Sequence, residues 1–417
     1  MPASLVAAGT GHGDPVAGLV LALALILLVA KLGGDLAARV GQPAVLGELL
    51  GGILLGNVPV FGRTFLEQMK SDPTLDMLGR IGALILLFEV GLESTVGQML
   101  RVGLSSLLVA TVGVIGPFVL GFGVGAWLLP GSSVYEHAFL GTVLCATSVG
   151  ITARVFKDLG RVQAPESRIV LGAAVIDDVL GLLVLAVVAA VVSAADQGHA
   201  LSGVVIAITV VKAVAFVALA IALGKQLSPH LFRQAARLRA GGVLLAVGLA
   251  FCFVLSWLAD VVGLAPIVGA FAAGLVLEEA HSGAFTGRGE RALDQLVEPV
   301  SHFLVPIFFV LMGARTDLPA LFKPQILVLA FALTLAAIIG KQICGLAVVE
   351  KGLDRVFVGL GMIPRGEVGL VVASIGQQLS VRGESMIDSA TFSACVFMVM
   401  VTTLLTPPLL KWRSRKI

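Results

Sequence analysis

Two adjacent carboxylates, Asp177 and Asp178, lie inside a long apolar stretch of this 417-residue chain. The apolar run continues for about ten residues beyond them and a comparable stretch precedes them, the length scale of a membrane-spanning helix. An ionisable side chain at membrane depth costs roughly 2.5–3.5 kcal/mol on insertion scales, so a pair of them requires a reason. The residue types favour binding and release of cations. The alternative is a solvated pair near a helix end, which the flanking apolar residues disfavour.

Helical geometry turns neighbouring side chains about 100° apart, so Asp177 and Asp178 face different surroundings. One can face a water-filled crevice while the other meets a partner across the helix bundle. Lys341 is the expected partner, because it lies in an apolar run over 326–349 with no acid of its own nearby. Burial disfavours the charged form of both an acid and an amine, so such a pair is suited to exchanging protons.

Two other apolar stretches contain residues that interrupt a helix. The segment ATSVGIT at 146–152 carries Thr147 and Ser148, and GMIPRGEVG at 361–369 contains Pro364, which has no backbone donor. Interrupted helices in corresponding places of two halves indicate an inverted-repeat transporter. An odd number of spans separates the two breaks, which gives the halves opposite directions in the membrane.

Where two half-helices meet, their dipole ends leave partial charges, and Arg365 and Glu367 are expected to offset them. The alternative is a lone proline kink beside a cytoplasmic Arg–Glu pair. The hydroxyls at the first break offer oxygen ligands to a hard cation such as Na+, although such groups often bond their own helix backbone. Glu89 and Glu93, one turn apart, are candidates for a cytoplasmic mouth, but a solvated helix end is the favoured interpretation.

The composition is that of a polytopic membrane protein, with 58% hydrophobic and 13% charged residues, against about a quarter charged in soluble proteins. Hydropathy over windows of about 20 residues predicts about 13 spans. They lie near 16–36, 43–58, 75–93, 104–129, 137–156, 167–193, 201–224, 240–260, 262–279, 299–314, 324–349, 355–378 and 389–410. The 4 cysteines and 6 histidines form no paired or metal-binding spacing, and we expect no cofactor.

Most of the 28 Lys and Arg residues fall in loops on one side of the membrane if the N-terminus lies outside. The positive-inside rule then places the C-terminus in the cytoplasm. The first apolar run lacks a preceding basic region, so we predict a retained span there and not a cleaved signal. Glu48 and Lys212 also lie within spans and are assigned no role. We expect no nucleic-acid partner.

The motifs ATSVGITARV, GAAVIDDVLGL, GLAPIVGAFAAGL and GMIPRGEVGLVVA resemble those of bacterial cation/proton antiporters with an aspartate pair, the monovalent cation:proton antiporter-2 family. The resemblance covers residues 40–410 and is closest to the electrogenic sodium/proton antiporters. It implies an all-α, inverted-repeat fold of about 13 transmembrane helices with two crossing discontinuous helices. The whole chain, 1–417, is predicted to form one integral membrane unit. The resemblance further implies a homodimer, with a six-helix core over 104–193 and 324–410, interface helices over 16–93 and 240–314, and a linker helix over 201–224.

By this resemblance, Asp178 is the main carboxylate for Na+, and Asp177 forms an ion pair with Lys341 that breaks when Na+ binds. Thr147 and Ser148 would lie where the broken helices cross. The implied function is exchange of Na+, or Li+, for protons by alternating access in the bacterial inner membrane, serving pH homeostasis. The chain is then a secondary transporter and not an enzyme.

Two departures from the family pattern bear on this interpretation. Asn57 stands where relatives often have proline, and we expect it to alter only a loop. Potassium-efflux relatives often carry a nucleotide-sensing domain after the last span, whereas this chain stops at Ile417 without a nucleotide-binding domain.

Two other functions stay open at this point. A K+/H+ antiporter or regulated K+ efflux system of the same family is the nearer one, because sequence does not reveal the size of the cation cavity. An intramembrane aspartyl protease is remote, because its two acids lie on separate helices with a GxGD signature that is absent here. The chain also has no GxxxxGK[ST] loop, so ATP is not expected to drive transport.

Overall fold

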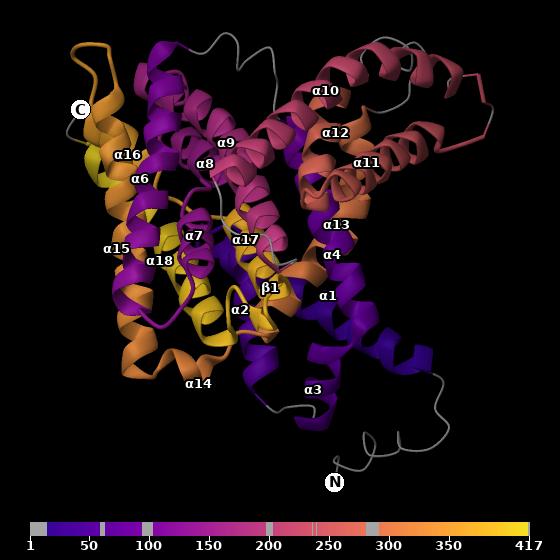
Figure 1. Cartoon of the computed structure of the whole chain (residues 1–417), viewed down its shortest axis with the longest axis horizontal. Helices are drawn as coiled ribbons and strands as arrows, with labels where there is room; N and C mark the ends of the chain where they lie inside the picture. Colours follow the sequence, from indigo (N-terminus) through magenta and orange to yellow (C-terminus); the bar gives the residue numbers. More distant parts are fainter. Residues whose placement is uncertain are drawn as a thin grey trace. The chain divides into compact units, whose positions relative to one another are not determined.

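The computed structural model describes residues 15–58, 63–93, 103–196, 203–235, 237–238, 240–280 and 292–415. The described chain is almost entirely helical (Figure 1). Its α-helices are α1 Pro15–Arg39, α2 Ala44–Asn57, α3 Arg63–Ser71, α4 Pro73–Glu93, α6 Leu104–Leu128, α7 Val134–Val143, α8 Val149–Asp158, α9 Pro165–Asp196, α10 Gly203–Ala235, α11 Val243–Val262, α12 Pro266–Ala280, α13 Leu293–Ala314, α14 Leu318–Leu321, α15 Pro324–Cys344, α16 Arg355–Gly361, α17 Glu367–Gln378 and α18 Ser389–Ser414. A short 3-10 helix, η2 Gly345–Ala347, and two strands, β1 Ser380–Val381 and β2 Glu384–Ser385, complete the described elements.

Among the described residues, 8 helices are long and apolar enough to cross a membrane. They belong to α1, α6, α9, α10, α11, α13, α15 and α18, and α2 and α12 are shorter apolar helices. Every predicted span falls on a described helix or on a pair of half-helices. The predicted all-α polytopic fold is therefore confirmed, and the predicted number of spans is compatible with it. Helix α10 continues to Ala235, well past the predicted end at 224.

The internal contacts of the chain divide it into two compact units. Unit 1 comprises residues up to Leu86 together with Glu298–Pro319, and unit 2 comprises Leu87–Val297 together with Ala320–Ile417. The predicted division into interface, linker and core helices concerns assembly and movement, and it stays a prediction.

In unit 1, helices α2 and α13 are in close backbone contact. A Cβ on Gly52 would lie 2.3 Å from the carbonyl oxygen of Val310, and a Cβ on Gly313 would lie 2.2 Å from that of Leu49. No side chain fits at either position. Small residues at a helix interface are what permits two membrane helices to approach this closely.

Asn57, at the end of α2, does more than alter a loop, and that prediction is wrong. Its Nδ2 donates to the carbonyl oxygens of Ile53 at 2.9 Å and Thr316 at 3.0 Å, and its Oδ1 accepts from Leu318 N at 3.4 Å. The side chain thus adds a bond to the last turns of α2 and binds the connection from α13 to α14. Proline, which has no such donor, could not make these bonds.

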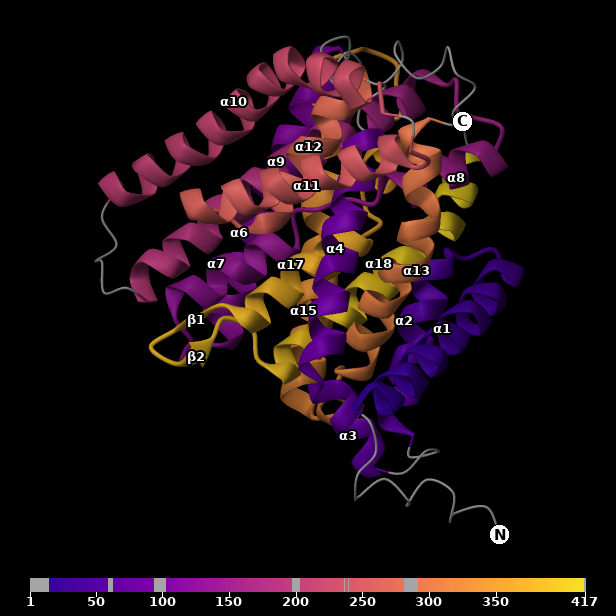
Figure 2. The same ribbon diagram turned by 90° about the vertical axis from the view of Figure 1, so that its right-hand side faces the viewer.

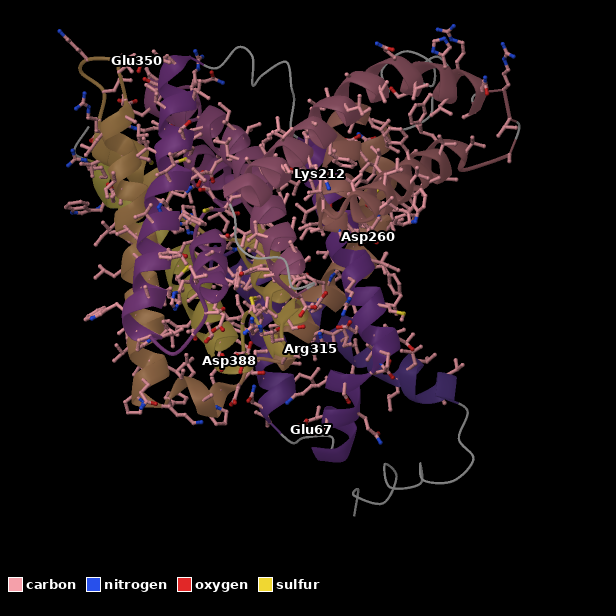
Figure 3. The ribbon with its side chains drawn as sticks, viewed as in Figure 1. Glu67, Lys212, Asp260, Arg315, Glu350 and Asp388 are labelled. Atoms are coloured by element: carbon pink, nitrogen blue, oxygen red, sulfur yellow. The ribbon has the colours of Figure 1, made fainter. Side chains whose placement is uncertain are left out.

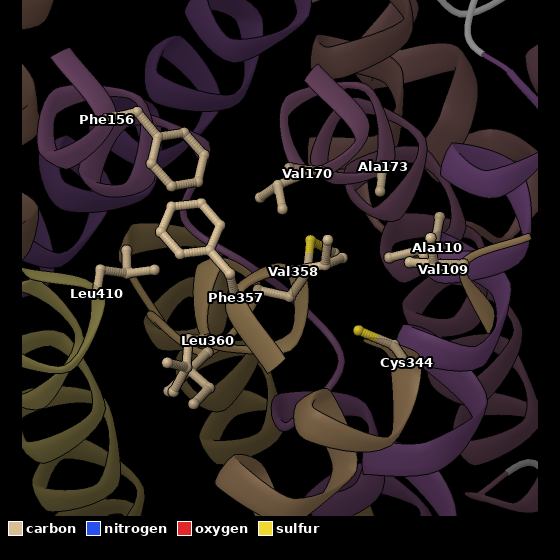
Figure 4. Packing of buried hydrophobic residues seen from close by; sticks show 14 of the residues in the cluster. Val109, Ala110, Phe156, Val170, Ala173, Cys344, Phe357, Val358, Leu360 and Leu410 are labelled. Carbon is tan, nitrogen blue, oxygen red and sulfur yellow. The ribbon is translucent and has the colours of Figure 1, made fainter. Parts of the chain in front are cut away.

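A buried apolar cluster of unit 2 gathers α6, α8, α9, α15, α16 and α18 around one core (Figure 4). Phe156 of α8 stacks on Phe357 of α16 with ring centroids 5.4 Å apart and an interplanar angle of 19°. Val170 of α9 and Leu410 of α18 are fully buried in the same cluster. This core fixes one half of each broken helix against α9, the helix that carries the two carboxylates.

A short β-hairpin with strands of two residues each follows α17 (Figure 2). Strands β1 and β2 pair antiparallel, with Val381 opposite Glu384. The turn residues Arg382 and Gly383 have φ of 55° and 86°, as a type I′ turn requires. The N–H of Arg382 donates to Asp196 Oδ1 at 3.0 Å. The hairpin therefore binds the C-terminal end of α9.

The N-terminus of α16 is capped by Asp354, which also binds the end of α18. Its Oδ1 accepts from Val356 N at 2.9 Å and Phe357 N at 3.0 Å, and its Oδ2 accepts from Arg413 Nε at 2.6 Å. Burial acts to raise the pKa of Asp354, but the bonds from Arg413 and from the backbone of α16 outweigh it and hold the pKa below its usual value.

A lowered folded-state pKa predicts how stability depends on pH. The ionic contribution of Asp354 is fully present above the unfolded-state pKa of about 3.9, and it is lost as pH falls through the lower folded-state pKa. Asp354→Asn, which keeps the cap, is expected to unfold about 1 kcal/mol more easily at neutral pH. Thermal unfolding in detergent should show this deficit shrinking as the pH falls below about 4.

Asp388→Asn is the matched control for this prediction (Figure 3). Asp388 caps α18 by accepting from Thr391 N at 2.7 Å, and it forms no ion pair within the described ranges. Its replacement should cost little at any pH. A deficit for Asp354→Asn that stays constant across pH would contradict the ionic explanation.

Candidate ion-binding site

Two helices of unit 2 are broken, and their unwound segments cross. Helix α7 gives way to α8 over residues 144–148, and α16 gives way to α17 over residues 362–366 (Figure 1). The N–H of Ser148 donates to the carbonyl of Pro364 at 2.9 Å, so the two breaks are joined by their backbones. The predicted pair of crossing discontinuous helices is confirmed.

Hydroxyl groups in the first break and in the first turn of α8 satisfy carbonyls at the second break. Thr152 Oγ1 donates to the carbonyl of Gly361 at 2.7 Å, and Thr147 Oγ1 donates to that of Met362 at 3.3 Å. These carbonyls lie at the C-terminal end of α16, where no helical donor remains. A Cβ on Gly366 would lie 2.7 Å from the side chain of Ser148, so a larger residue there would push the crossing segments apart.

The structure brings Lys341 of α15 to Asp177 of α9. Lys341 Nζ lies 2.7 Å from Asp177 Oδ1, and both side chains are 0% exposed. The side chain of Thr147 also interacts with the Asp177 carboxyl. A buried ion pair of this kind is stable only while both partners are present, because either alone would be an uncompensated buried charge.

Asp178 is the carboxylate of the two that is not paired with Lys341. It is 4% exposed, and its Oδ1 has no hydrogen-bond partner among the described residues. The charged groups that act on it are Asp177, Glu367, Lys341 and Glu93, three acids and one base. A buried carboxylate oxygen without a donor is costly, and this one is in an acidic setting that a proton or a small cation would neutralise.

Arg365, in the second break, is fully buried. Its Nη1 donates to the carbonyl of Ala146 at 2.7 Å and to that of Cys145 at 3.4 Å, and its Nη2 donates to that of Ala337 at 3.4 Å. Glu367 is the first residue of α17 and interacts with the Ser148 side chain. A cation beside carbonyls after α7 and an acid at the N-terminus of α17 are both favourable to helix dipoles.

Glu93 is exposed at the end of α4 and Glu89 is half-buried. The charges acting on Glu93 are Glu89, Glu367 and Asp294 of α13. Asp294 was missed by the sequence analysis, and its position in the first turn of a helix was the only available signal. Lys212 is exposed on α10 (Figure 3). The structure therefore adds an acid to the two candidates for a cytoplasmic mouth and leaves Lys212 outside the site.

The profile of the transmembrane sodium/hydrogen exchangers matches residues 24–412 of this chain. The chain is 36% identical to the high-affinity Na+/H+ antiporter NhaS3 of Synechocystis sp., over 95% of this chain and 90% of that protein. It is 34% identical to the Na+/H+-K+ antiporter GerN of Bacillus cereus, over 94% of this chain and 95% of that protein.

The fold has a solved counterpart in the sodium proton antiporter MjNhaP1 of Methanocaldococcus jannaschii. The TM-score is 0.70 and the identity 17%, over 95% of this chain and 98% of that chain. The resemblance to cation/proton antiporters found in the motifs is thereby confirmed. With two broken helices crossing beside a buried carboxylate pair, the chain belongs to the sodium/hydrogen exchanger family of membrane antiporters, which are transporters and not enzymes.

Proposed function

We propose that this protein exchanges Na+, or Li+, for protons by alternating access, with Na+ bound at Asp178. The observation that supports this most directly is the geometry of Asp178: a buried carboxylate with an unpaired oxygen, next to the ion pair of Asp177 and Lys341. Carboxylate and hydroxyl oxygens are the ligands that hard cations prefer. Thr147 and Ser148 supply the hydroxyls at the crossing of the broken helices.

In the proposed cycle, protons and Na+ compete for one group of side chains. Na+ that binds at Asp178 is also coordinated by the Asp177 carboxylate. The bond from Lys341 Nζ to Asp177 is then broken. When Na+ leaves, the ion pair re-forms and Asp178 takes up a proton. Because the two acids and the amine titrate as one coupled group, more than one proton can move for each cation. Glu89 and Glu93 would line the cytoplasmic approach to this site.

Arg365, Glu367 and Pro364 have a structural part in this proposal. Pro364 cannot donate a backbone hydrogen bond and so helps to keep the second break unwound. Arg365 and Glu367 offset the dipole ends of the half-helices. The contacts of Arg365 with three carbonyls support this role.

K+ is the second candidate cation. One relative at 34% identity is named as a Na+/H+-K+ antiporter, and carboxylate ligands accept K+ as well as Na+. The remote protease alternative has less support, because both acids lie on one helix and Asp177 is paired with Lys341.

The deciding experiment is collapse of a pH gradient in proteoliposomes after addition of Na+, Li+ or K+ in turn. We expect Na+ and Li+ to collapse the gradient and K+ to do so weakly. A response to K+ alone would mean that the transported cation is K+ and not Na+. No response to any of the three cations would refute exchange.

The assembly and placement are proposed on the same basis. The chain would lie in a bacterial inner membrane with its N-terminus outside and its C-terminus in the cytoplasm, as the distribution of Lys and Arg indicates. Helices within 16–93 and 240–314 would form a homodimer, 104–193 and 324–410 would move as the transport core, and 201–224 would link them. Exposed leucines along α1, Leu21, Leu28, Leu32 and Leu36, support contact of α1 with lipid or a partner.

A further inference from the structure

Helix α6 lies beside the ion pair of Asp177 and Lys341, and the residue of α6 that faces this pair is a glycine. A Cβ built on Gly113 would lie 3.4 Å from Lys341 Nζ and 3.6 Å from Asp177 Oδ1. Gly113 therefore faces both charged atoms without a side chain of its own between them. None of the residues predicted for the site comes from this helix, because α6 contains no charged side chain.

Close packing holds α6 in this position against α15, the helix that carries Lys341. A Cβ on Gly340 would lie 2.8 Å from the backbone of Pro117, and a Cβ on Gly116 would lie 3.0 Å from the carbonyl oxygen of Gly340. The two helices thus meet backbone to backbone one residue before Lys341. Lys341 therefore directly follows the point at which the two backbones are closest.

Pro117 changes the hydrogen bonding of Gly113. In an α-helix the N–H of residue 117 would donate to the carbonyl of residue 113. Pro117 lies inside α6 and has no N–H, so the Gly113 carbonyl loses that helical donor. Gly113 is buried, and a buried carbonyl that lacks its usual donor is a ready acceptor for another one.

In the exchange proposed above, Lys341 needs such an acceptor whenever it keeps its proton after Na+ binds. When a cation occupies the two carboxylates, the Lys341 ammonium is released from Asp177 while still fully buried. A buried ammonium without a partner is strongly unfavourable. We propose that the Gly113 carbonyl, freed by Pro117, accepts the Lys341 ammonium when a cation displaces it from Asp177. This inference rests on the proposed function.

A neutral acceptor suits this step. A backbone carbonyl binds an ammonium more weakly than a carboxylate does, so Lys341 returns to Asp177 once the cation leaves. The carbonyl also carries no net charge that would compete for the cation. Gly113 and Pro117 are positioning residues in this account, since they act on the cation only through Lys341.

Pro117→Ala tests the proposal, because alanine restores the N–H that engages the Gly113 carbonyl. We expect the apparent KM for Na+ in proteoliposomes to rise about fivefold while the maximal rate stays within about twofold, as for partial loss of one hydrogen bond to a charged group. The effect is partial because a carbonyl oxygen has two lone pairs.

Gly113→Ala is the second variant, and it keeps the carbonyl free. Its methyl group would lie at ordinary van der Waals distance from the resting ion pair, so folding is preserved while the space beside the ammonium is filled. The KM for Na+ should again rise several-fold. Gly123→Ala is the matched control on the same helix, because a Cβ there would meet nothing within 4 Å, and its KM should be unchanged.

A background that lacks only Lys341 shows whether the effect passes through this residue. Thermal stabilisation by added Na+ reports the apparent affinity even where transport is slow. In Lys341→Gln, addition of Pro117→Ala should leave that affinity unchanged. An equal fall in affinity in both backgrounds would mean a merely structural role and would overturn the proposal. If the Gln variant does not fold, the KM values of Gly113→Ala and Gly123→Ala decide.

Unchanged KM values for both Pro117→Ala and Gly113→Ala would also overturn the inference, with exchange by the wild type left standing. Absence of Na+-dependent flux and of Na+-dependent stabilisation in the wild type would instead refute the proposed function. The two failures are therefore distinguishable.

Discussion

The Asp178→Asn variant is expected to lose Na+-dependent proton flux by roughly a hundredfold or more, the scale seen when a positioned proton-transfer group is removed. Asparagine has nearly the same shape as aspartate, but it neither binds nor releases a proton in this range and carries no charge for a cation. The buried, unpaired oxygen of Asp178 would become a neutral amide atom. A pH-sensitive dye inside proteoliposomes, with Na+ added outside, measures the flux.

Asp196→Asn is the control for that variant, because it lies at the end of the same helix. Its oxygen accepts a backbone N–H from Arg382, a bond that asparagine can also accept, so flux should be normal. Flux at wild-type rates from a folded Asp178→Asn protein would remove Asp178 from the site.

Loss of Lys341 is expected to have the largest effect on stability. In Lys341→Gln the Asp177 carboxylate stays fully buried but loses the ammonium group that neutralises it. Breaking a buried ion pair in this way costs roughly 3–5 kcal/mol. The temperature of unfolding in detergent should fall accordingly. The double variant Lys341→Gln with Asp177→Asn removes both charges and should regain most of the loss.

The double variant also shows whether an unpaired Asp177 causes the loss of stability. If it unfolds at the same temperature as Lys341→Gln alone, the deficit arises from lost packing of the lysine chain and not from an unpaired Asp177. Neither variant should transport normally, so stability and flux must be measured on the same preparations.

Much of the architecture could be predicted because hydropathy and helix-breaking residues are local signals. Apolar windows located the long apolar helices, and Pro364 with its glycines located one break. The other break has no proline, and Thr147 and Ser148 indicated it only by being polar within an apolar run. Its unwound segment lies a few residues earlier than the ATSVGIT motif suggests, at 144–148, because the crossing partner fixes where α7 ends.

The site could be predicted as far as charged side chains reveal it. Asp177 and Lys341 are separated by many helices in sequence, but each was an uncompensated charge in an apolar run, which made them mutual candidates. Gly113 gave no such signal, since its contribution is a backbone carbonyl and an absent side chain. Asn57 was misjudged because its partners at 316 and 318 are supplied by a distant segment.

The bond between Ser148 N and the Pro364 carbonyl involves main-chain atoms alone, so it persists through side-chain replacement at 148. The two inverted repeats are consequently hydrogen-bonded to each other at the point where a helix of each is unwound. A displacement of either unwound segment would strain this bond, so the geometry of one break depends on that of the other.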